Sequence, residues 1–302
     1  MVKCPQTGKE GRPLEKIIET ISRLFGCNKS EIQGFEKIDG GMMNESFVFA
    51  LRGEKYVYRR AGAGTEKLVD RHHEKECIEQ AHRLDYDRTY ICMDGEEGWK
   101  LSRYVEKFRE PDYQSQEDMR TVAATLRRLH AEPFRTNFGL DPWRDAMALE
   151  ALAEEKCPGC FDRDRVLRER IGALYELTVG DGVEKCFCHG DTYRNNWMLC
   201  PDGEVILIDW EYAGTSDPGV DVGYLIIDAG YDFHTAEQFI YTYLGQEDNN
   251  RLFHFMAYSA IIAYYWFVWA TYRENCGADT RGALEHWRDM AYKYSEIKRK
   301  EQ

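Results

Sequence analysis

Two aspartates and an asparagine in the second half of the chain have the types and spacing that phosphoryl transfer requires. The segment HGDTYRNNW (189–197) contains Asp191 and, five positions later, Asn196, and the segment LIDWEY (207–212) contains Asp209. A carboxylate can orient a hydroxyl group and take its proton, while carboxylate and amide oxygens hold magnesium against phosphates. Asp191 is therefore the candidate catalytic base, and Asn196 and Asp209 are the candidate magnesium ligands.

The order of these two motifs resembles that of a known enzyme superfamily. His-Gly-Asp-x4-Asn followed by Ile-Asp-Trp-Glu-Tyr is similar to the catalytic loop and the metal-binding aspartate of the aminoglycoside phosphotransferase and choline/ethanolamine kinase superfamily. Each motif alone is common in turns, but the ordered pair around a hairpin is much more specific. The resemblance covers roughly residues 40–287. It implies an α+β, bilobal, protein-kinase-like fold with ATP and Mg²⁺ bound between the lobes.

The resemblance extends to residues of the first lobe that would bind the nucleotide. The segment GGMMNES (40–46) resembles the loop that covers the phosphates in this family, and it supplies Gly40, Gly41, Asn44 and Ser46. A hairpin then leads to Arg59, which matches the arginine that replaces the usual kinase lysine in choline kinases. Glu74 is the closest match to the helix glutamate that holds this cation, with Glu76 as the second choice. A solvated helix face is the alternative interpretation of both glutamates.

Aromatic residues near the C-terminus bear on the acceptor. Trp266 and Trp269 resemble the paired tryptophans that line the choline pocket of choline kinases, and a quaternary ammonium is bound mainly by aromatic faces. Further candidates for the acceptor site are Glu211, Tyr212, Asp228 and Tyr231. The alternative is that this aromatic stripe fills the core of a buried helix.

The interpretation is thus an ATP- and Mg²⁺-dependent small-molecule kinase, similar to bacterial choline kinases, that converts choline to phosphocholine. Ethanolamine kinase is the nearest alternative, because a primary ammonium could donate hydrogen bonds to Glu211 or Asp228. An aminoglycoside or other small-alcohol phosphotransferase comes next. A different class of protein also remains open, namely a pseudokinase that binds ligands without turnover.

The elements predicted to position these residues fall into two lobes. The N-terminal nucleotide-binding lobe (1–105) is expected to contain a helix at 14–25, a hairpin of strands at 46–51 and 56–59, a helix at 69–84, and strands near 89–93 and 99–104. A polar linker at 106–115 would begin the C-terminal lobe (106–302), which carries catalysis and acceptor binding. Helices are predicted there at 117–130, 142–155 and 164–177, a hairpin at 196–209, and long helices beyond it.

The composition and net charge of the chain bear on which binding partners it can have. The chain has 302 residues, of which 43% are hydrophobic and 31% charged, with a formal charge of −13. An acidic chain with pI near 5.2 argues against nucleic acid and suits a cationic amino alcohol. The apolar stretch 255–270 is too short and too rich in tyrosine for membrane insertion and predicts a buried helix. The oligomeric state is left open.

The chain has ten cysteines, and whether two local pairs of them have any role is left open. With no signal-like apolar segment at the start, a reduced, cytoplasmic setting is expected. The pairs Cys157/Cys160 and Cys186/Cys188 could suggest zinc, but the second lacks the usual ligand spacing. His130 and Asp221 match family positions: the resemblance implies a structural role for His130 and implies that Asp221 braces the catalytic loop.

Overall fold

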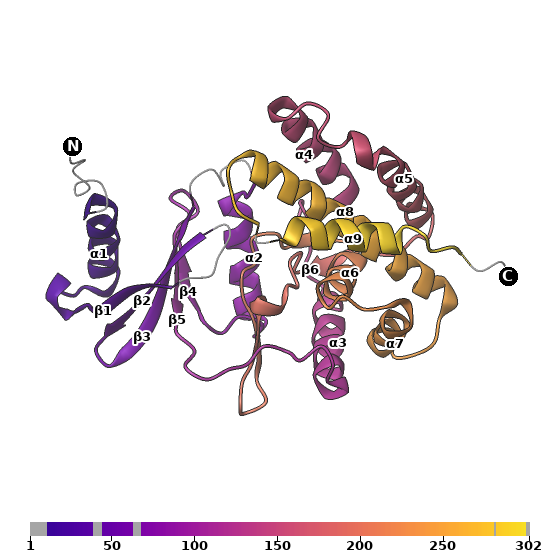
Figure 1. Ribbon diagram of the computed structural model, residues 1–302. Coiled ribbons are helices and arrows are strands. Elements are labelled where there is room, and N and C mark those ends of the chain that lie inside the picture. Colours follow the sequence, from indigo (N-terminus) through magenta and orange to yellow (C-terminus); the bar gives the residue numbers. More distant parts are fainter. Residues whose placement is uncertain (1–10, 39–43, 63–67, 281, 300–302) are drawn as a thin grey trace. The chain divides into compact units, whose positions relative to one another are not determined.

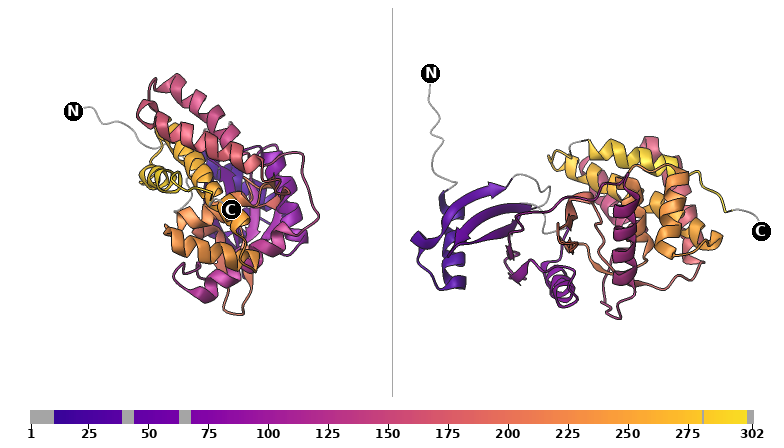
Figure 2. Two further views of the ribbon diagram at one scale, coloured as in Figure 1. Left: turned by 90° about the vertical axis from the view of Figure 1, so that its right-hand side faces the viewer. Right: turned by 90° about the horizontal axis from the view of Figure 1, so that it is seen from below.

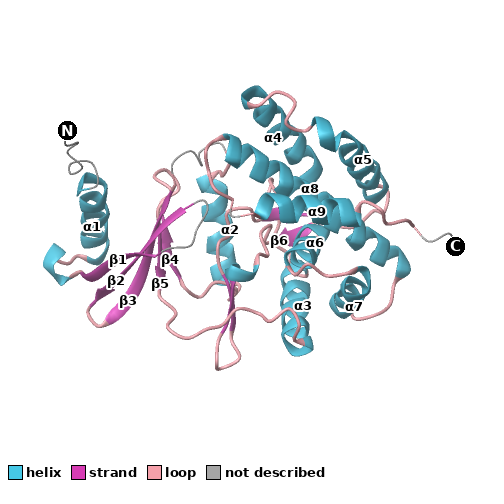
Figure 3. Ribbon diagram, in the orientation of Figure 1, coloured by secondary structure: helices cyan, strands magenta, loops and turns pink. Residues whose placement is uncertain are grey.

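The computed structural model describes residues 11–38, 44–62, 68–280 and 282–299, and its chain divides into two compact units (Figure 1). The first unit comprises residues 1–68 and 89–106, and the second comprises 69–88 and 107–302. The sheet belongs to the first unit and most helices to the second, which confirms the predicted α+β class (Figure 3). The segment 69–88 groups with the second unit, whereas the sequence-based division kept it in the first lobe.

The first unit is a five-stranded antiparallel sheet with one helix, α1 (Gly11–Phe25). The strand order is β1 (Gln33–Ile38), β2 (Asn44–Leu51), β3 (Glu54–Ala61), β5 (Lys100–Arg103) and β4 (Tyr90–Met93). Strands β2 and β3 form the predicted hairpin, and Leu51 lies opposite Glu54 at its end. Arg52 and Gly53 have φ values of 54° and 86°, the left-handed conformation that tight two-residue hairpin turns need.

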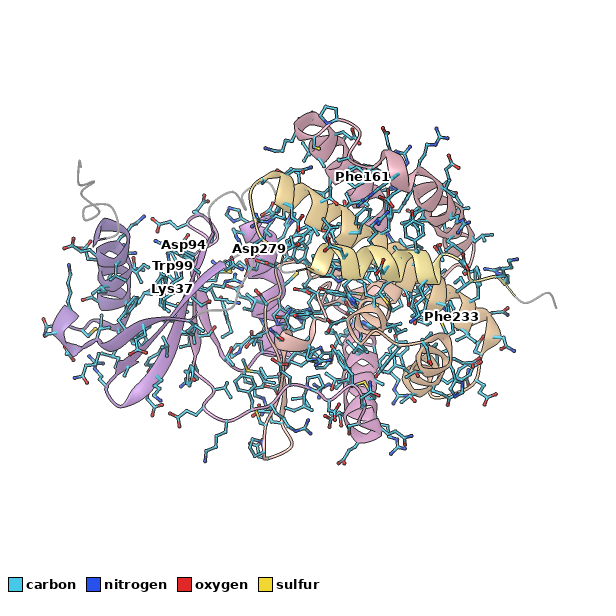
Figure 4. The ribbon with its side chains drawn as sticks, in the orientation of Figure 1. Lys37, Asp94, Trp99, Phe161, Phe233 and Asp279 are labelled. Carbon is cyan, nitrogen blue, oxygen red and sulfur yellow. The ribbon has the colours of Figure 1, made fainter. Side chains whose placement is uncertain are left out.

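The core of the first unit follows from the alternation of side chains along β2. Phe47, Phe49 and Leu51 are buried and face one side of the sheet, because successive residues of a strand point to opposite faces. They pack with Ile17 and other residues of α1. Trp99, labelled in Figure 4, joins the same cluster from the turn before β5.

The second unit is mostly helical. Its helices are α2 (Arg71–Arg83), α3 (Gln116–His130), α4 (Pro142–Lys156), α5 (Arg165–Val179), α6 (Gly219–Asp228), α7 (Phe233–Leu244), α8 (Asn249–Asn275) and α9 (Ala283–Tyr294). Helix α8 contacts α4, α5, α6, α7 and α9, and α9 lies along it in all three views (Figures 1 and 2).

Helix α8 is the centre of this unit. By length and composition it could cross a membrane, but its 18-residue apolar window is 100% buried within the unit. Phe161, labelled in Figure 4, packs edge-on against Phe267 of this helix. A helix that is apolar all round and covered by neighbours is the expected form of a core helix. The predicted buried helix at 255–270 is therefore present.

Two small sheets frame the catalytic motifs. Strands β7 (Trp197–Leu199) and β8 (Val205–Leu207) form the predicted hairpin between the motifs. Strand β6 (Cys186–Cys188) pairs with β9 (Gly214–Ser216), a pairing that the sequence did not suggest. The segment 189–196 thus runs from the end of β6 to the start of β7, with both ends held by strands.

Candidate active site

Asp191 lies in the loop between β6 and β7 and is held by side chains from two directions. The side-chain amide of Asn196 donates to the backbone oxygen of Asp191 at 2.9 Å and to its Oδ2 at 3.0 Å. The Tyr224 hydroxyl of α6 interacts with the Asp191 side chain and favours its charged form, which lowers the pKa of Asp191. The other carboxylate oxygen, Oδ1, is buried and has no hydrogen-bond partner within the described part of the chain. Asp191 is therefore oriented through one oxygen while the other can accept a proton.

The surroundings of Asp191 also favour proton uptake. Burial raises the pKa of Asp191, the negative charges of Asp209 and Glu211 raise it further, and the bonds from Asn196 and Tyr224 oppose the rise, with a result of about 8. A carboxyl group with a pKa near neutrality is a better general base than an ordinary aspartate.

The carboxylate of Asp221, on α6, stabilises the catalytic loop through hydrogen bonds to its backbone. Its Oδ2 accepts from the backbone N–H of His189 at 2.8 Å, and its Oδ1 accepts from that of Gly190 at 2.7 Å. Oδ2 also pairs with Nε2 of His130 at 2.9 Å, and the other ring nitrogen of His130 contacts the Tyr243 hydroxyl at 2.7 Å. These contacts give Asp221 and His130 the bracing roles expected from sequence.

Gly190 allows the loop to turn just before the base. Its φ is +83°, in the region that disfavours any side chain, and an added Cβ would lie 2.2 Å from the backbone oxygen of Tyr212. The neighbouring His189 is fully buried, and its Nε2 contacts the backbone oxygen of Ile208 at 2.9 Å. The base and the segment that carries Asp209 are consequently tied together.

Asp209 follows β8 with a φ of +70°, an uncommon conformation for a residue with a side chain. Carboxylate oxygens of Asp209, Glu74 and Glu211 all lie within 4.8 Å of one another. Because Asn196 donates its NH₂ group to Asp191, its carbonyl oxygen is the atom suited to a metal. This set of oxygen donors fits Mg²⁺, which prefers such ligands.

Glu211 and Glu74 are both bound by an arginine that the sequence did not single out. Nη1 of Arg71, the first residue of α2, donates to Oε2 of Glu74 at 2.6 Å and to Oε2 of Glu211 at 2.9 Å. Glu74 is buried, whereas Glu76 is exposed. Burial thus distinguishes Glu74 from Glu76, and which of the two pairs with Arg59 stays a prediction.

An aromatic cluster lies beside Asp191. The Trp266 ring centroid is 4.9 Å from that of Tyr224, 5.2 Å from that of Tyr212 and 5.5 Å from that of Trp269. Nε1 of Trp269 donates to the Tyr212 hydroxyl at 3.0 Å, while Nε1 of Trp266 is buried without a partner among the described residues. Trp287 of α9 completes the cluster at 5.5 Å from Trp266. Tyr224 joins this cluster to the candidate base.

The other two residues predicted for the acceptor site have different neighbours. The Tyr231 ring contacts Tyr113, and its hydroxyl donates to the Tyr113 backbone oxygen at 2.6 Å. Oδ2 of Asp228 accepts from the Tyr113 hydroxyl at 2.6 Å and from the backbone N–H of Arg194 at 3.0 Å. These contacts tie the catalytic loop to the segment that precedes α3, and a direct role of Tyr231 and Asp228 toward an acceptor stays a prediction.

Three of the residues predicted to bind the nucleotide, Asn44, Ser46 and Arg59, lie on β2 and β3. Ser46 is the cross-strand partner of Arg59, which is 5% exposed, and Asn44 is the partner of Ala61. Gly40 and Gly41 lie outside the described residues. Arg59 belongs to the first unit and Glu74 to the second, so their pairing stays a prediction.

Sequence reasoning missed Arg71, Tyr113, Tyr224 and Trp287. Tyr224 lies three residues after Asp221 on the same helix, a spacing that places both on one face and could have indicated it. Trp287 is an isolated aromatic residue on an amphipathic helix, and Arg71 is one of several charges around Glu74. Neither Trp287 nor Arg71 carries a sequence signal that distinguishes it from an ordinary core or surface residue.

The cysteines show structural contacts. The Sγ atoms of Cys186 and Cys188 lie 3.6 Å apart, and they group with His130 rather than with His189 as possible soft-metal ligands. Both ring nitrogens of His130 are engaged by Tyr243 and Asp221. Cys157 and Cys160 belong to no cluster of three possible ligands among the described residues.

A catalytic loop with an aspartate, an amide five residues later and a second aspartate after a hairpin is typical of a kinase-like phosphotransferase. The model of the phosphotransferase enzyme family matches residues 34–254. This protein belongs to that family.

Several similar proteins are named as LicA or as choline kinases. Protein LicA of Haemophilus influenzae is 24% identical over 268 residues, covering 85% of this chain and 78% of the relative. A probable choline kinase of Arabidopsis thaliana is 26% identical over 260 residues, covering 79% and 73%. The crystal structure of choline kinase LicA from Streptococcus pneumoniae superposes with a TM-score of 0.80 at 25% identity, covering 94% of this chain and 100% of that one.

Proposed function

We propose that this protein transfers the γ-phosphoryl group of ATP to the hydroxyl group of choline. The observation that carries the proposal is the aromatic cluster around Trp266: the Tyr224 ring stacks against Trp266 at 4.9 Å, and the Tyr224 hydroxyl influences the pKa of Asp191. A base beside aromatic faces suits an acceptor with a hydroxyl at one end and a quaternary ammonium at the other. The choline kinase relatives support the same acceptor.

The chain's own residues account for the chemistry. Oδ1 of Asp191 accepts the hydroxyl proton as the acceptor oxygen bonds to the γ-phosphorus, and the bond from that phosphorus to the β,γ-bridging oxygen breaks. The products are phosphocholine and ADP. Asn196 holds Asp191 in place through Oδ2, so the base reaches the transition state already oriented.

Residues that would hold Mg²⁺ are Asn196 and Asp209, with Glu211 and Glu74 nearby. When bound, the ion supplies positive charge that offsets the charge of the phosphates. A related structure, LicA in complex with AMP, at 25% identity and a TM-score of 0.77, supports nucleotide use. We assign the phosphate contacts of the first unit to Asn44, Ser46 and Arg59 as part of this proposal.

The direct test is ADP release by the purified protein with ATP and Mg²⁺ against choline, ethanolamine and one aminoglycoside. We expect the highest kcat/KM with choline. Preference for another acceptor would support the kinase activity but contradict choline as the substrate. ATP binding without turnover of any acceptor would indicate a binding module instead.

The contribution of the aromatic cluster is tested with Trp266→Ala. A desolvated cation–π contact is worth about 2 kcal/mol, so kcat/KM for choline should fall roughly 30-fold. Trp266→Phe should recover part of that loss because it keeps an aromatic face. Trp143→Ala is the matched control, since Trp143 packs against Tyr175 and Tyr264 and outside this cluster. Equal losses in Trp266→Ala and Trp143→Ala would contradict the assignment.

A further inference from the structure

Two buried cysteines and a histidine lie together next to the start of the catalytic loop, apart from the residues assigned to phosphoryl transfer. The Sγ atoms of Cys186 and Cys188 lie 3.6 Å apart, and one ring nitrogen of His130 lies within 4.8 Å of both. Cys186 and Cys188 are 5% and 0% exposed, the His130 side chain is 6% exposed, and neither cysteine forms a disulfide. Three side chains of the kinds that zinc-like ions prefer thus lie within reach of one ion.

The spacing of the two sulfur atoms is close to that of a tetrahedral zinc site. Zn–S bonds of about 2.3 Å at tetrahedral angles place two sulfur ligands about 3.8 Å apart, and a histidine nitrogen lies about 3.6 Å from each. The observed Sγ–Sγ distance of 3.6 Å means that the two side chains would move little to hold an ion. Cys186 and Cys188 come this close because residues two apart on a strand, here β6, point to the same face.

His130 has the hydrogen bonding that metal-bound histidines usually have. Its Nε2 pairs with Oδ2 of Asp221 at 2.9 Å, and a carboxylate on one ring nitrogen fixes the ring and makes the other nitrogen a better ligand. That other nitrogen, Nδ1, contacts the Tyr243 hydroxyl at 2.7 Å, so the hydroxyl would leave Nδ1 when an ion binds. Metal binding through Nδ1 therefore leaves the contact between His130 and Asp221 intact.

The two thiols differ in how readily they lose a proton. The hydrogen bond from the Cys188 thiol and the charge of His130 lower the pKa of Cys186, although burial opposes this. Burial raises the pKa of Cys188. A coordinated thiol is deprotonated by the ion itself, so the second thiolate would form as the ion binds.

We propose that Cys186, Cys188 and His130 bind a divalent ion of the zinc class, at a site separate from the residues proposed for Mg²⁺. Two thiolates and an imidazole select such an ion over Mg²⁺, which prefers oxygen ligands. The ion would join β6 to the last residue of α3, since His130 ends that helix. It should stabilise the protein, because an ion that binds only the folded state raises Tm. The proposal requires nothing of the acceptor or of the reaction.

The number of thiolates bound to the ion identifies this site. Two other groups of possible ligands lie among the described residues, and they offer either no sulfur atom or a single one: Glu74 with Asp209 and Glu211, and Cys200 with Asp202 and Glu204. Co²⁺ takes the geometry of zinc in such sites, and its charge-transfer absorption grows with the number of thiolates bound. The Co²⁺ spectrum therefore distinguishes a site with two cysteines from the other two groups.

The experiment titrates the reduced protein with Co²⁺, without ATP or Mg²⁺, and then displaces the ion with Zn²⁺. We expect a thiolate charge-transfer band that saturates at one ion per chain, with visible bands of tetrahedral intensity. Cys186→Ala and Cys188→Ala should each weaken this band and lower the Zn²⁺ affinity at least about tenfold, because losing a ligand costs no less than losing a partner of a ligand. The control variants Cys200→Ala and Cys157→Ala/Cys160→Ala should keep the wild-type band and affinity.

Absence of a thiolate band in the saturated wild type would overturn the proposal, and so would a band that is unchanged in Cys186→Ala and Cys188→Ala. A band that is lost in one of the control variants instead would assign the ion to that other site and would equally overturn it.

Two further measurements cover the case in which a cysteine variant does not fold. Anomalous diffraction from wild-type crystals soaked in Zn²⁺ locates the ion without any substitution. A peak between the two Sγ atoms and His130 would support the proposal, whereas peaks only elsewhere would overturn it. Zn²⁺ should also raise the Tm of the wild type and of Cys200→Ala, and an unchanged wild-type Tm would contradict binding to the folded state.

Discussion

The substitution Asp221→Asn should strongly lower the free energy of unfolding, although Asp221 contacts no reacting group. The carboxylate accepts the backbone N–H groups of His189 and Gly190 and pairs with His130, all away from water. Asparagine offers one acceptor oxygen and turns its NH₂ group toward a donor. Leaving one partner of a buried ion pair alone costs about 3–5 kcal/mol.

For a unit of about 200 residues, that cost corresponds to a fall in Tm of roughly 6–20 °C. Thermal unfolding followed by circular dichroism measures it. Asp202→Asn is the matched control, because Asp202 makes the same kind of bond to a backbone N–H, that of Glu204, in an exposed turn. This control should change the free energy of unfolding by less than about 1 kcal/mol.

The pH dependence of the Tm difference between wild type and Asp221→Asn tests whether the Asp221–His130 pair causes it. Burial tends to raise the pKa of Asp221, but the bond and charge of His130 outweigh it and the pKa lies below its usual value. Burial likewise tends to lower the pKa of His130, yet Asp221 and nearby acidic groups leave that pKa raised.

A carboxyl group whose pKa is lowered by folding stabilises the fold above its unfolded pKa near 4, and this stabilisation is lost as pH falls through its folded pKa. A histidine whose pKa is raised by folding stabilises the fold below its unfolded pKa near 6.5, and this stabilisation is lost as pH rises through its folded pKa. The difference between wild type and Asp221→Asn should therefore be largest between about pH 4 and 6.5. A Tm change equal to that of Asp202→Asn, or one that does not vary with pH, would refute this reasoning.

Three further outcomes concern the reaction. Asp191→Asn should lower kcat by about 10²–10⁴ in an ADP-release assay while calorimetry shows ATP binding retained; undiminished kcat would remove Asp191 as the base. Gly190→Ala should abolish turnover, because its Cβ would clash with Tyr212, and folded protein with normal kcat would contradict the geometry. Chelation of Mg²⁺ should stop the reaction reversibly, and Asp209→Asn should raise the Mg²⁺ concentration needed for half-maximal rate; an unchanged requirement would exclude Asp209 as a ligand.

The parts of the fold that could be predicted from sequence are those with local signals. The β2–β3 hairpin has alternating residues and a turn containing Gly53, and α3 has regular apolar spacing with Ser115 as its N-terminal cap. The β6–β9 pairing had no such signal, because each strand has three residues and the partner lies across the whole catalytic region. Non-local pairing of short strands depends on tertiary contacts that periodicity does not carry.

The residues of the candidate site also divide into those with a local signal in the sequence and those without one. Asp191, Asn196 and Asp209 could be found because their spacing is set by one loop and one hairpin. Arg71 could not, since its contact with Glu211 joins segments far apart in the sequence. Sequence reasoning placed Glu211 at the acceptor; the structure shows Glu211 bonded to Arg71, and its role toward an acceptor stays a prediction.

Of the six aspartates between the end of β6 and the end of α6, five show how contacts separate roles that residue type cannot. Asp217 accepts from the backbone N–H of Gly219, Asp221 accepts two backbone N–H groups, and Asp228 accepts one together with a tyrosine hydroxyl. A carboxylate bound by backbone donors has its lone pairs committed and its position set, so it braces the fold. Asp191 is held through one oxygen only, and Asp209 turns toward other carboxylates. Proton transfer needs an oxygen that is not already occupied by a donor, which Oδ1 of Asp191 offers among the described residues. The closeness of Asp209 to two other carboxylates suits a metal ion, and both roles stay predictions.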